Sequence, residues 1–109
     1  MPNLNDDFSK LFASRKVACA GFAWYEAADY PEILRMMADR KRLPATHAEW
    51  LAKAEKQEQS IKNQGTRVIR AIIKPNDFRI WCAKRGHNID AKGRMAFANE
   101  QAARDAGLI

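Results

Sequence analysis

The sequence predicts a small α+β domain built from a two-stranded sheet and about five helices. Residues 17–25 are short and almost continuously apolar, and residues 66–74 are short and rich in β-branched side chains, so each is expected to form a strand. The segments between and after them place apolar residues at helical spacing, with capping residues at their starts and, for three of the four, a glycine at the end. The chain has 109 residues, of which 47% are hydrophobic and 29% charged, which fits a single globular domain.

The chain is predicted to divide into an N-terminal helical arm, residues 1–14, and one α+β domain, residues 15–109. In the arm, residues 4–13 place three apolar side chains on one helical stripe. The first strand, residues 17–25, is almost continuously apolar and short, which is typical of a buried strand.

Two helices are predicted between the strands. Asp29 can cap the first, which should end near Asp39. Thr46 and Glu49 have the spacing of a capping box at the start of the second, which spans about residues 45–64. The apolar stripe of this second helix consists of Trp50, Leu51, Ala54 and Ile61. Its solvated face consists of Lys53, Glu55, Lys56, Glu58 and Lys62.

Two further helices are predicted after the second strand. Asn76 or Asp77 can cap the first of them, and Gly86 can end it. Asp90 can cap the last helix, which spans about residues 91–106. The inner stripe of this last helix consists of Met95, Ala98 and Ala102.

The two strands introduce similar segments. Each is followed by a helix with an Asp at its start and an aromatic residue next, Asp29-Tyr30 in one case and Asp77-Phe78 in the other. The chain can therefore be described as two β-α-α units. Because two strands alone make a weak sheet, an open strand edge favours pairing with a second copy, and a homodimer is expected.

The chain is basic, with a net charge of +6 and a pI near 9.6. Residues 1–54 hold eight Lys or Arg and seven Asp or Glu, whereas residues 55–109 hold eleven and six. Such a bias attracts nucleic acid, acidic proteins or anionic lipid. It also serves solubility alone, so the charge leaves both interpretations open.

The two cysteines, Cys19 and Cys82, lie far apart among apolar neighbours, which is typical of buried free thiols. Residues 1–14 contain two Asp and no apolar core of a secretory signal. The chain holds no apolar stretch long enough to cross a membrane. These features predict a reduced, cytoplasmic protein without membrane association.

No catalytic, metal-binding or cofactor-binding pattern is present in the sequence. His47 and His87 have no partner at ligand spacing, and the glycines are isolated instead of forming a phosphate-binding loop. Nothing in the sequence supplies a base for Cys82. The sequence therefore predicts neither an enzyme nor a cofactor.

Two groups of residues are candidates for contacting a partner. Trp24 and Tyr25, at the end of the first strand, can line a partner surface; alternatively Trp24, Trp50 and Trp81 meet in one core. A helix-turn-helix-like pair over about residues 76–105 would instead contact nucleic acid. Its contact residues would be Lys84, Arg85, Lys92 and Arg94.

Four segments carry a resemblance to a known family. They are Ala23-Trp24-Tyr25, Leu43-Pro44-Ala45-Thr46 with Glu49-Trp50-Leu51, Trp81-Cys82-Ala83-Lys84-Arg85-Gly86 and Ala96-Phe97-Ala98-Asn99-Glu100. Over about residues 17–104 they resemble a family of small, uncharacterised bacterial cytosolic proteins of unknown function. The resemblance implies a bacterial, cytosolic protein and no particular activity, ligand or catalytic residue.

Taken together, the residues favour a non-catalytic interaction domain that binds a protein partner or itself. The alternative is a nucleic-acid-binding protein that uses the last two helices. A small enzyme whose site forms across a dimer interface is a third hypothesis.

Overall fold

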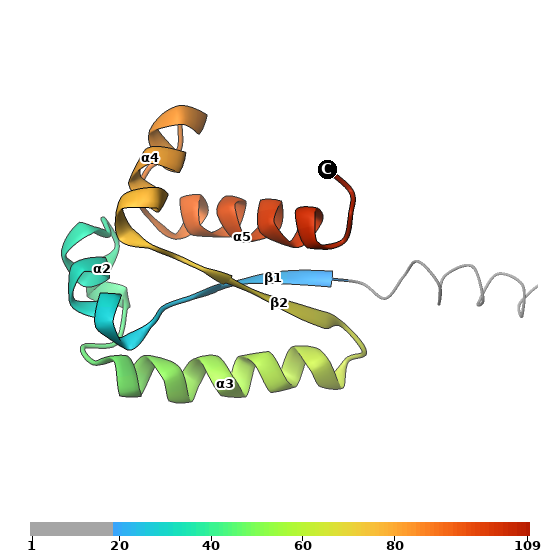
Figure 1. Cartoon of the computed structure of the whole chain (residues 1–109). Helices are drawn as coiled ribbons and strands as arrows, with labels where there is room; N and C mark the ends of the chain where they lie inside the picture. The colour runs from blue at the N-terminus through green and yellow to red at the C-terminus, as the bar shows by residue number, and fades with distance from the viewer. Residues whose placement is uncertain (1–18) are drawn as a thin grey trace, which may run out of the picture.

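The computed structural model describes residues 19–109 as an α+β domain in which a two-stranded parallel sheet lies between two helices (Figure 1). The elements in chain order are β1 (Cys19–Trp24), η1 (Ala27–Asp29), α2 (Tyr30–Met36), η2 (Arg40–Arg42), α3 (His47–Asn63), β2 (Arg67–Ile72), α4 (Pro75–Arg85) and α5 (Ala91–Asp105). The predicted class and both strands are confirmed. Of the five predicted helices, four are found in this part of the chain; the fifth, over residues 4–13, lies outside the described residues.

The strand register decides which side chains face each helix. Trp24 pairs with Ile72 and Gly21 with Ile69, and paired residues project from the same face of the sheet. The face toward α3 carries large side chains. On this face Trp24 packs edge-on against Trp50, with ring centroids 5.0 Å apart. The face toward α5 carries small residues, among them Gly21 and its neighbour on the same face, Ala23.

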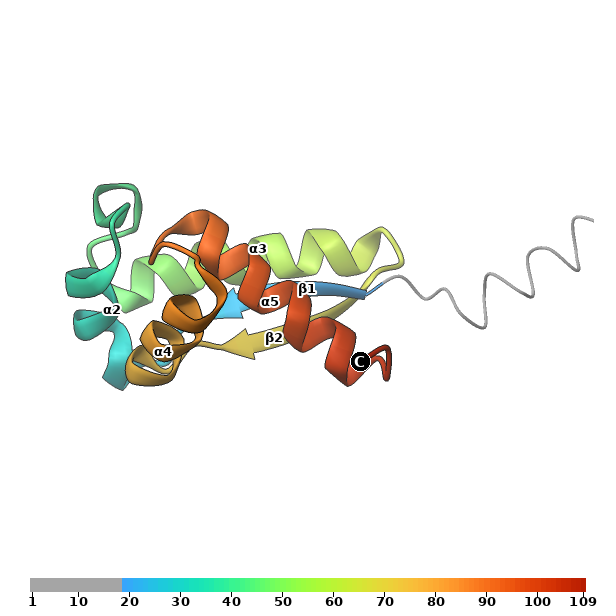
Figure 2. The ribbon, with the colours of Figure 1, turned by 90° about the horizontal axis from the view of Figure 1, so that it is seen from above.

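These small residues let α5 lie directly on β1. A Cβ atom on Gly21 would stand 2.0 Å from the backbone oxygen of Ala98, so only glycine fits at this position. Ala98 and Ala102, on the facing side of α5, are buried. Figure 2 shows α5 crossing the sheet, with α4 beside its N-terminal end.

The aromatic core lies on the α3 side and at the end of the sheet. Tyr25 packs against Trp50, with ring centroids 4.7 Å apart, and against Tyr30 at 5.8 Å. Trp81 is not part of this group: it stacks on His87 and meets Phe97 edge-on at 5.3 Å. The expectation that all three tryptophans meet in one core holds for Trp24 and Trp50, while Trp81 is only partly buried and packs against the same core from α4.

Two of the predicted helix caps are confirmed. Thr46 Oγ1 accepts a hydrogen bond from the Glu49 N–H at 3.2 Å, and Asp90 Oδ1 accepts one from the Gly93 N–H at 3.0 Å. Asp29 precedes α2, but its carboxylate makes no capping bond and pairs with Lys74 at 3.1 Å.

The boundaries of two helices differ from the prediction. The helix expected to begin after Asn76 or Asp77 begins at Pro75, because proline suits the first helical turn, where its missing N–H has no partner to lose. The helix expected to end near Asp39 ends at Met36, where Met37 turns to an extended conformation.

Two side chains were also assigned to the wrong face. Glu58, predicted on the solvated face of α3, is 6% exposed and pairs with Arg70 of β2 at 2.7 Å. Met95, predicted on the inner stripe of α5, is 64% exposed, and Arg94 takes the inward position beside it. In both cases a salt bridge buries a charged residue that composition alone places in water.

The predicted order of two β-α-α units is confirmed for the described residues. Among its strand contacts, α3 packs against β2, while α5 packs mainly against β1, and the two helices lie on opposite faces of the sheet. The short helices α2 and α4 contact one another at the end of the sheet where both strands finish. No helix between residues 19 and 109 has the length and apolar character needed to span a membrane.

Candidate functional site

A groove with a volume of about 650 Å³ runs along the edge of β1 that does not face β2. Residues from both faces of β1 line it: Gly21 and Ala23 project toward α5, and Phe22 projects toward α3. Because both faces of one strand reach the same groove, its floor is the edge of that strand.

One face of each flanking helix forms a wall. The α3 wall consists of Trp50, Lys53, Ala54 and Gln57, joined by Lys56. The α5 wall consists of Ala91, Arg94, Met95 and Ala98. Apart from Lys56, each set has the spacing i, i+3, i+4, i+7, which places its members on a single helical stripe. These two stripes, with the strand edge between them, define what we call the β1 groove.

The backbone at the floor of the β1 groove is open. The Ile73 N–H donates to the Trp24 carbonyl at 2.9 Å, so Trp24 directs its backbone groups toward β2. Successive residues of a strand direct these groups to opposite sides, and the Tyr25 carbonyl indeed points away, toward His47 Nε2 at 2.8 Å. Gly21 and Ala23 therefore direct their N–H and C=O groups into the groove, where no residue from 19 to 109 bonds them.

The walls are mostly apolar, with a cationic margin. Lys53 and Lys56 are exposed, and neither forms an ion pair with any residue of the described chain. No Asp or Glu lines the groove. The groove is therefore an apolar channel in which the free charges are positive.

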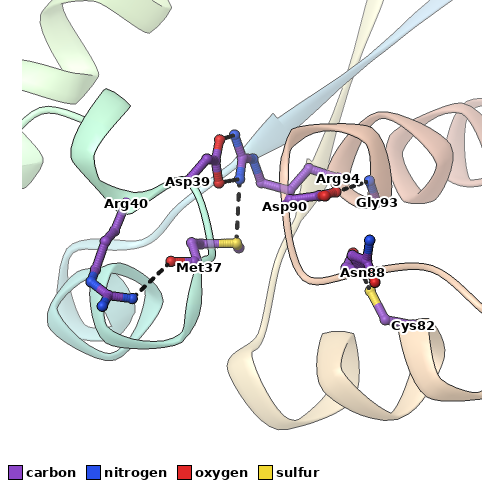
Figure 3. A network of polar contacts seen from close by, with 8 residues as sticks. All are labelled: Met37, Asp39, Arg40, Cys82, Asn88, Asp90, Gly93 and Arg94. Atoms are coloured by element: carbon purple, nitrogen blue, oxygen red, sulfur yellow. Dashed lines mark hydrogen bonds and ion pairs between the residues drawn. The ribbon is translucent and has the colours of Figure 1, made fainter.

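Arg94 of the α5 wall belongs to a mostly buried ion pair, drawn in Figure 3. Arg94 donates from Nη1 and Nη2 to the two carboxylate oxygens of Asp39, at 2.7 and 2.8 Å. Hydrogen bonding from Arg94 lowers the pKa of Asp39 below its usual value. Burial raises the pKa of the neighbouring Tyr25 to about 12, although the positive charge of Arg94 opposes this shift. The charge of Arg94 itself is therefore held by Asp39.

Of the two aromatic candidates from the sequence, one reaches the groove. Tyr25 lines it, but only 3% of the residue is exposed, and Trp24 is 7% exposed within the core. Arg70 lies over the Trp24 ring, 3.8 Å from its centroid, and covers it further. These two aromatic residues therefore support the groove from the core and expose little surface to a partner.

The four candidate cations near the last two helices are not brought together as one free set. Arg94 is bound to Asp39, and Arg85 is paired with Glu100. Lys84 and Lys92 are exposed and form no ion pair within the described residues. Two of the four therefore have their charge engaged inside the domain.

The residues that sequence reasoning missed are those of the groove walls. Lys53 and Lys56 were assigned to a solvated face, and Met95 to the core. The available signal was the matching i, i+3, i+4, i+7 stripe on two helices separated by a strand. That signal identifies a shared groove only once the order of the layers is known.

Between residues 19 and 109, no three His, Cys, Asp or Glu side chains are grouped so that they could hold a metal ion. Comparison with known proteins gave no match to a family model, a curated protein or a solved structure.

Proposed function

We propose that this chain is a protein-interaction domain that binds an extended segment of a partner protein along the β1 groove. The observation that carries the proposal is the open backbone of Gly21 and Ala23 at the floor of an apolar groove. An extended chain placed there adds a strand to the sheet: its main chain pairs with β1, and its side chains pack on the two helical walls.

The size and lining of the groove support this mode of binding. A volume of about 650 Å³ is comparable with that of pockets for small molecules, so the groove has room for side chains of a bound segment. The walls offer apolar surface from α3 and α5, while the floor offers directional hydrogen bonds. Affinity would come from both, and specificity from the side chains that alternate toward the walls.

The second open edge, along β2, suits a second copy of the chain. The cations that border it are all paired: Arg67 with Asp105, Arg70 with Glu58, and Arg104 with Glu100. Ile72, 44% exposed, adds apolar surface there. Pairing of two β2 edges would bring no free charges into opposition, so we propose a homodimer at this edge.

We place this interaction domain in the bacterial cytoplasm. Two features support that location: both cysteines are free, and Cys82 is fully buried as a reduced thiol, which suits a reducing compartment. The bacterial origin is proposed from the resemblance of residues 17–104 alone.

Nucleic-acid binding is the second candidate function. The observation that favours it is the set of cations without ion pairs in the described chain: Arg40, Lys41, Arg42, Lys53, Lys56, Lys62, Lys84 and Lys92. Titration with mixed-sequence oligonucleotides at two salt concentrations tests it. Generic attraction gives dissociation constants of about 10⁻⁴ to 10⁻⁶ M at physiological salt. Submicromolar affinity at that salt would make nucleic acid the preferred ligand.

The test of the main proposal selects peptides from a random library against the purified full chain. The affinities of the selected peptides are then measured for wild type, Ala23→Pro and Ile72→Pro. Proline at position 23 removes an N–H that faces the groove and no bond to β2, so the sheet is retained. Proline at position 72 makes the same change on the β2 edge.

We expect the selected peptides to bind wild type and Ile72→Pro with equal affinity. They should bind Ala23→Pro about tenfold more weakly, because one main-chain hydrogen bond is lost and the proline ring keeps the peptide backbone away from β1. In nuclear magnetic resonance spectra of the wild type, the amides of Gly21 and Ala23 should shift on binding. Equal affinity for all three proteins, with those amides unmoved, would contradict the proposal.

A further inference from the structure

We infer that the segment bound in the β1 groove is one in which acidic and apolar residues alternate. The inference rests on the proposed function, and it adds the chemistry of the partner. It follows from the difference between the two walls, since a strand on the floor sends alternate side chains to α3 and to α5.

The α3 wall selects for acidic side chains. Lys53 and Lys56 lie on it, exposed and without an ion pair in the described chain. They are three residues apart, or roughly 4.5 Å along the helix axis. Alternate residues of a strand are roughly 6.7 Å apart, a difference that long, flexible lysine side chains readily span. Two carboxylates on one side of a bound strand can therefore each meet an ammonium group.

The α5 wall selects for apolar side chains. Its exposed members are Met95 and Ala91, while Ala98 is buried behind them. Arg94, the only charged residue of this wall, is bound by both carboxylate oxygens of Asp39 and offers no free charge. Met95 is 64% exposed and does not pack against the hydrophobic core. A flexible thioether exposed on a wall suits the packing of varied apolar side chains.

Charge also argues against a second copy as the occupant of this groove. Two β1 edges paired together would bring Lys53 and Lys56 of one molecule near the same residues of the other. The chain as a whole carries a net charge of +6, so no excess of acidic residues offsets this repulsion. An acidic segment from another protein removes the conflict and neutralises the cationic margin.

The experiment compares three short capped peptides with the full chain by calorimetry. In the first, Glu alternates with Val; in the second, Gln replaces each Glu; in the third, Lys replaces it. We expect the Glu peptide to bind the wild type roughly three- to tenfold more tightly than the Gln peptide, and the Lys peptide to bind most weakly. Added salt should reduce the Glu–Gln difference.

A pair of charge-matched variants locates the effect. Lys53→Glu with Lys56→Glu should reverse the preference, so that the Lys peptide binds better than the Glu peptide. Lys62→Glu with Lys84→Glu changes the net charge equally at exposed positions outside the groove, and should leave the order of the peptides unchanged.

The outcomes separate this inference from the proposed function. If all three peptides bind alike, or if the two double variants behave alike, the acidic partner is wrong while strand addition stands. If none of the three binds but library-selected peptides do, the alternation is wrong. If no peptide of any kind binds, both proposals fail. If Ala23→Pro abolishes self-association measured by sedimentation, the occupant is a second copy instead.

Discussion

Asp39 holds both terminal nitrogens of Arg94 with its two carboxylate oxygens, at 2.7 and 2.8 Å, and so ties the loop after α2 to the first turns of α5. Only 11% of the Arg94 side chain and 18% of the Asp39 side chain are exposed. A third contact, from Arg94 Nη1 to Met37 Sδ at 3.3 Å, lies on the core side of the pair. Through Arg94, this ion pair adjoins the β1 groove.

Replacing Arg94 by Met should destabilise the fold, because it leaves the Asp39 carboxylate partly buried without a partner. We expect a loss of about 2 kcal/mol in the free energy of unfolding, less than for a fully buried pair because some exposure remains. Adding Asp39→Leu should recover much of that loss. Urea denaturation measures both, and a double variant no more stable than Arg94→Met would contradict this account.

The same pair should make stability depend on pH. The pKa of Asp39 is lowered in the folded state by hydrogen bonds from Arg94, relative to its ordinary value of 3.8. A lowered carboxyl pKa stabilises the fold above the unfolded value and loses this contribution as pH falls through the folded value. The stability difference between wild type and Arg94→Met should therefore shrink below about pH 3.8. A constant difference down to that pH and beyond would exclude the assigned role of Asp39.

Gly21→Ala should destabilise the domain by about 2 kcal/mol or more, because the added Cβ would stand 2.0 Å from the Ala98 backbone oxygen. Since the obstruction is backbone, Ala98→Gly should not relieve it. Ala23→Gly, on the same face of β1, serves as the comparison and should cost less, about 1 kcal/mol. Thermal melting of the three variants distinguishes them; a melting temperature for Gly21→Ala equal to that of wild type would mean that α5 does not rest on β1.

The two tyrosines should resist ionisation in the folded protein. Burial raises the pKa of Tyr25 to about 12 and also raises that of Tyr30, whose hydroxyl donates to the Pro44 carbonyl at 2.7 Å. A raised pKa stabilises the fold below the unfolded value of 10.0, and this contribution is lost as pH rises through the folded value. Tyrosinate absorbance should thus appear at higher pH in the native protein than in urea. Coincident titration curves would contradict the burial of the two tyrosines.

The two free cysteines should differ in reactivity. Cys82 is 1% exposed, and burial raises the pKa of its thiol, whereas Cys19 is only half-buried at the start of β1. A thiol reagent should therefore modify Cys19 in the native protein and Cys82 only on unfolding. Cys19→Ser provides the control, since it should leave almost no rapid labelling. Rapid labelling of that variant would show that α4 does not protect Cys82.

Local features of the fold were predictable from sequence wherever a single residue type determines them. Thr46 and Asp90 cap the helices expected of them, and Gly86 adopts the left-handed conformation that ends α4. The predictions that failed concern residues whose burial depends on contacts between distant elements. Glu58 and Arg94 are buried because Arg70 and Asp39 come from elsewhere in the chain to meet them, and spacing along one helix carries no information about such partners.

The β1 groove was unpredictable for the same reason. Its walls come from α3 and α5, and its floor from the outer edge of β1, so it exists only after the layers are assembled. Trp24 and Tyr25 were singled out for their aromatic character, but such residues fill the core of a small domain before they serve a partner.

The parallel pairing of β1 with β2 has a consequence for how the chain acquires its structure. Each residue of β1 pairs with one 48 positions further along, as Cys19 does with Arg67, so no strand contact is local. During synthesis β1 must wait, unpaired, until α3 and then β2 have left the ribosome, and it receives its cover from Ala98 later still. Such distant contacts slow folding. Until they form, the nascent β1 segment exposes apolar side chains and is the stretch that most needs protection by chaperones.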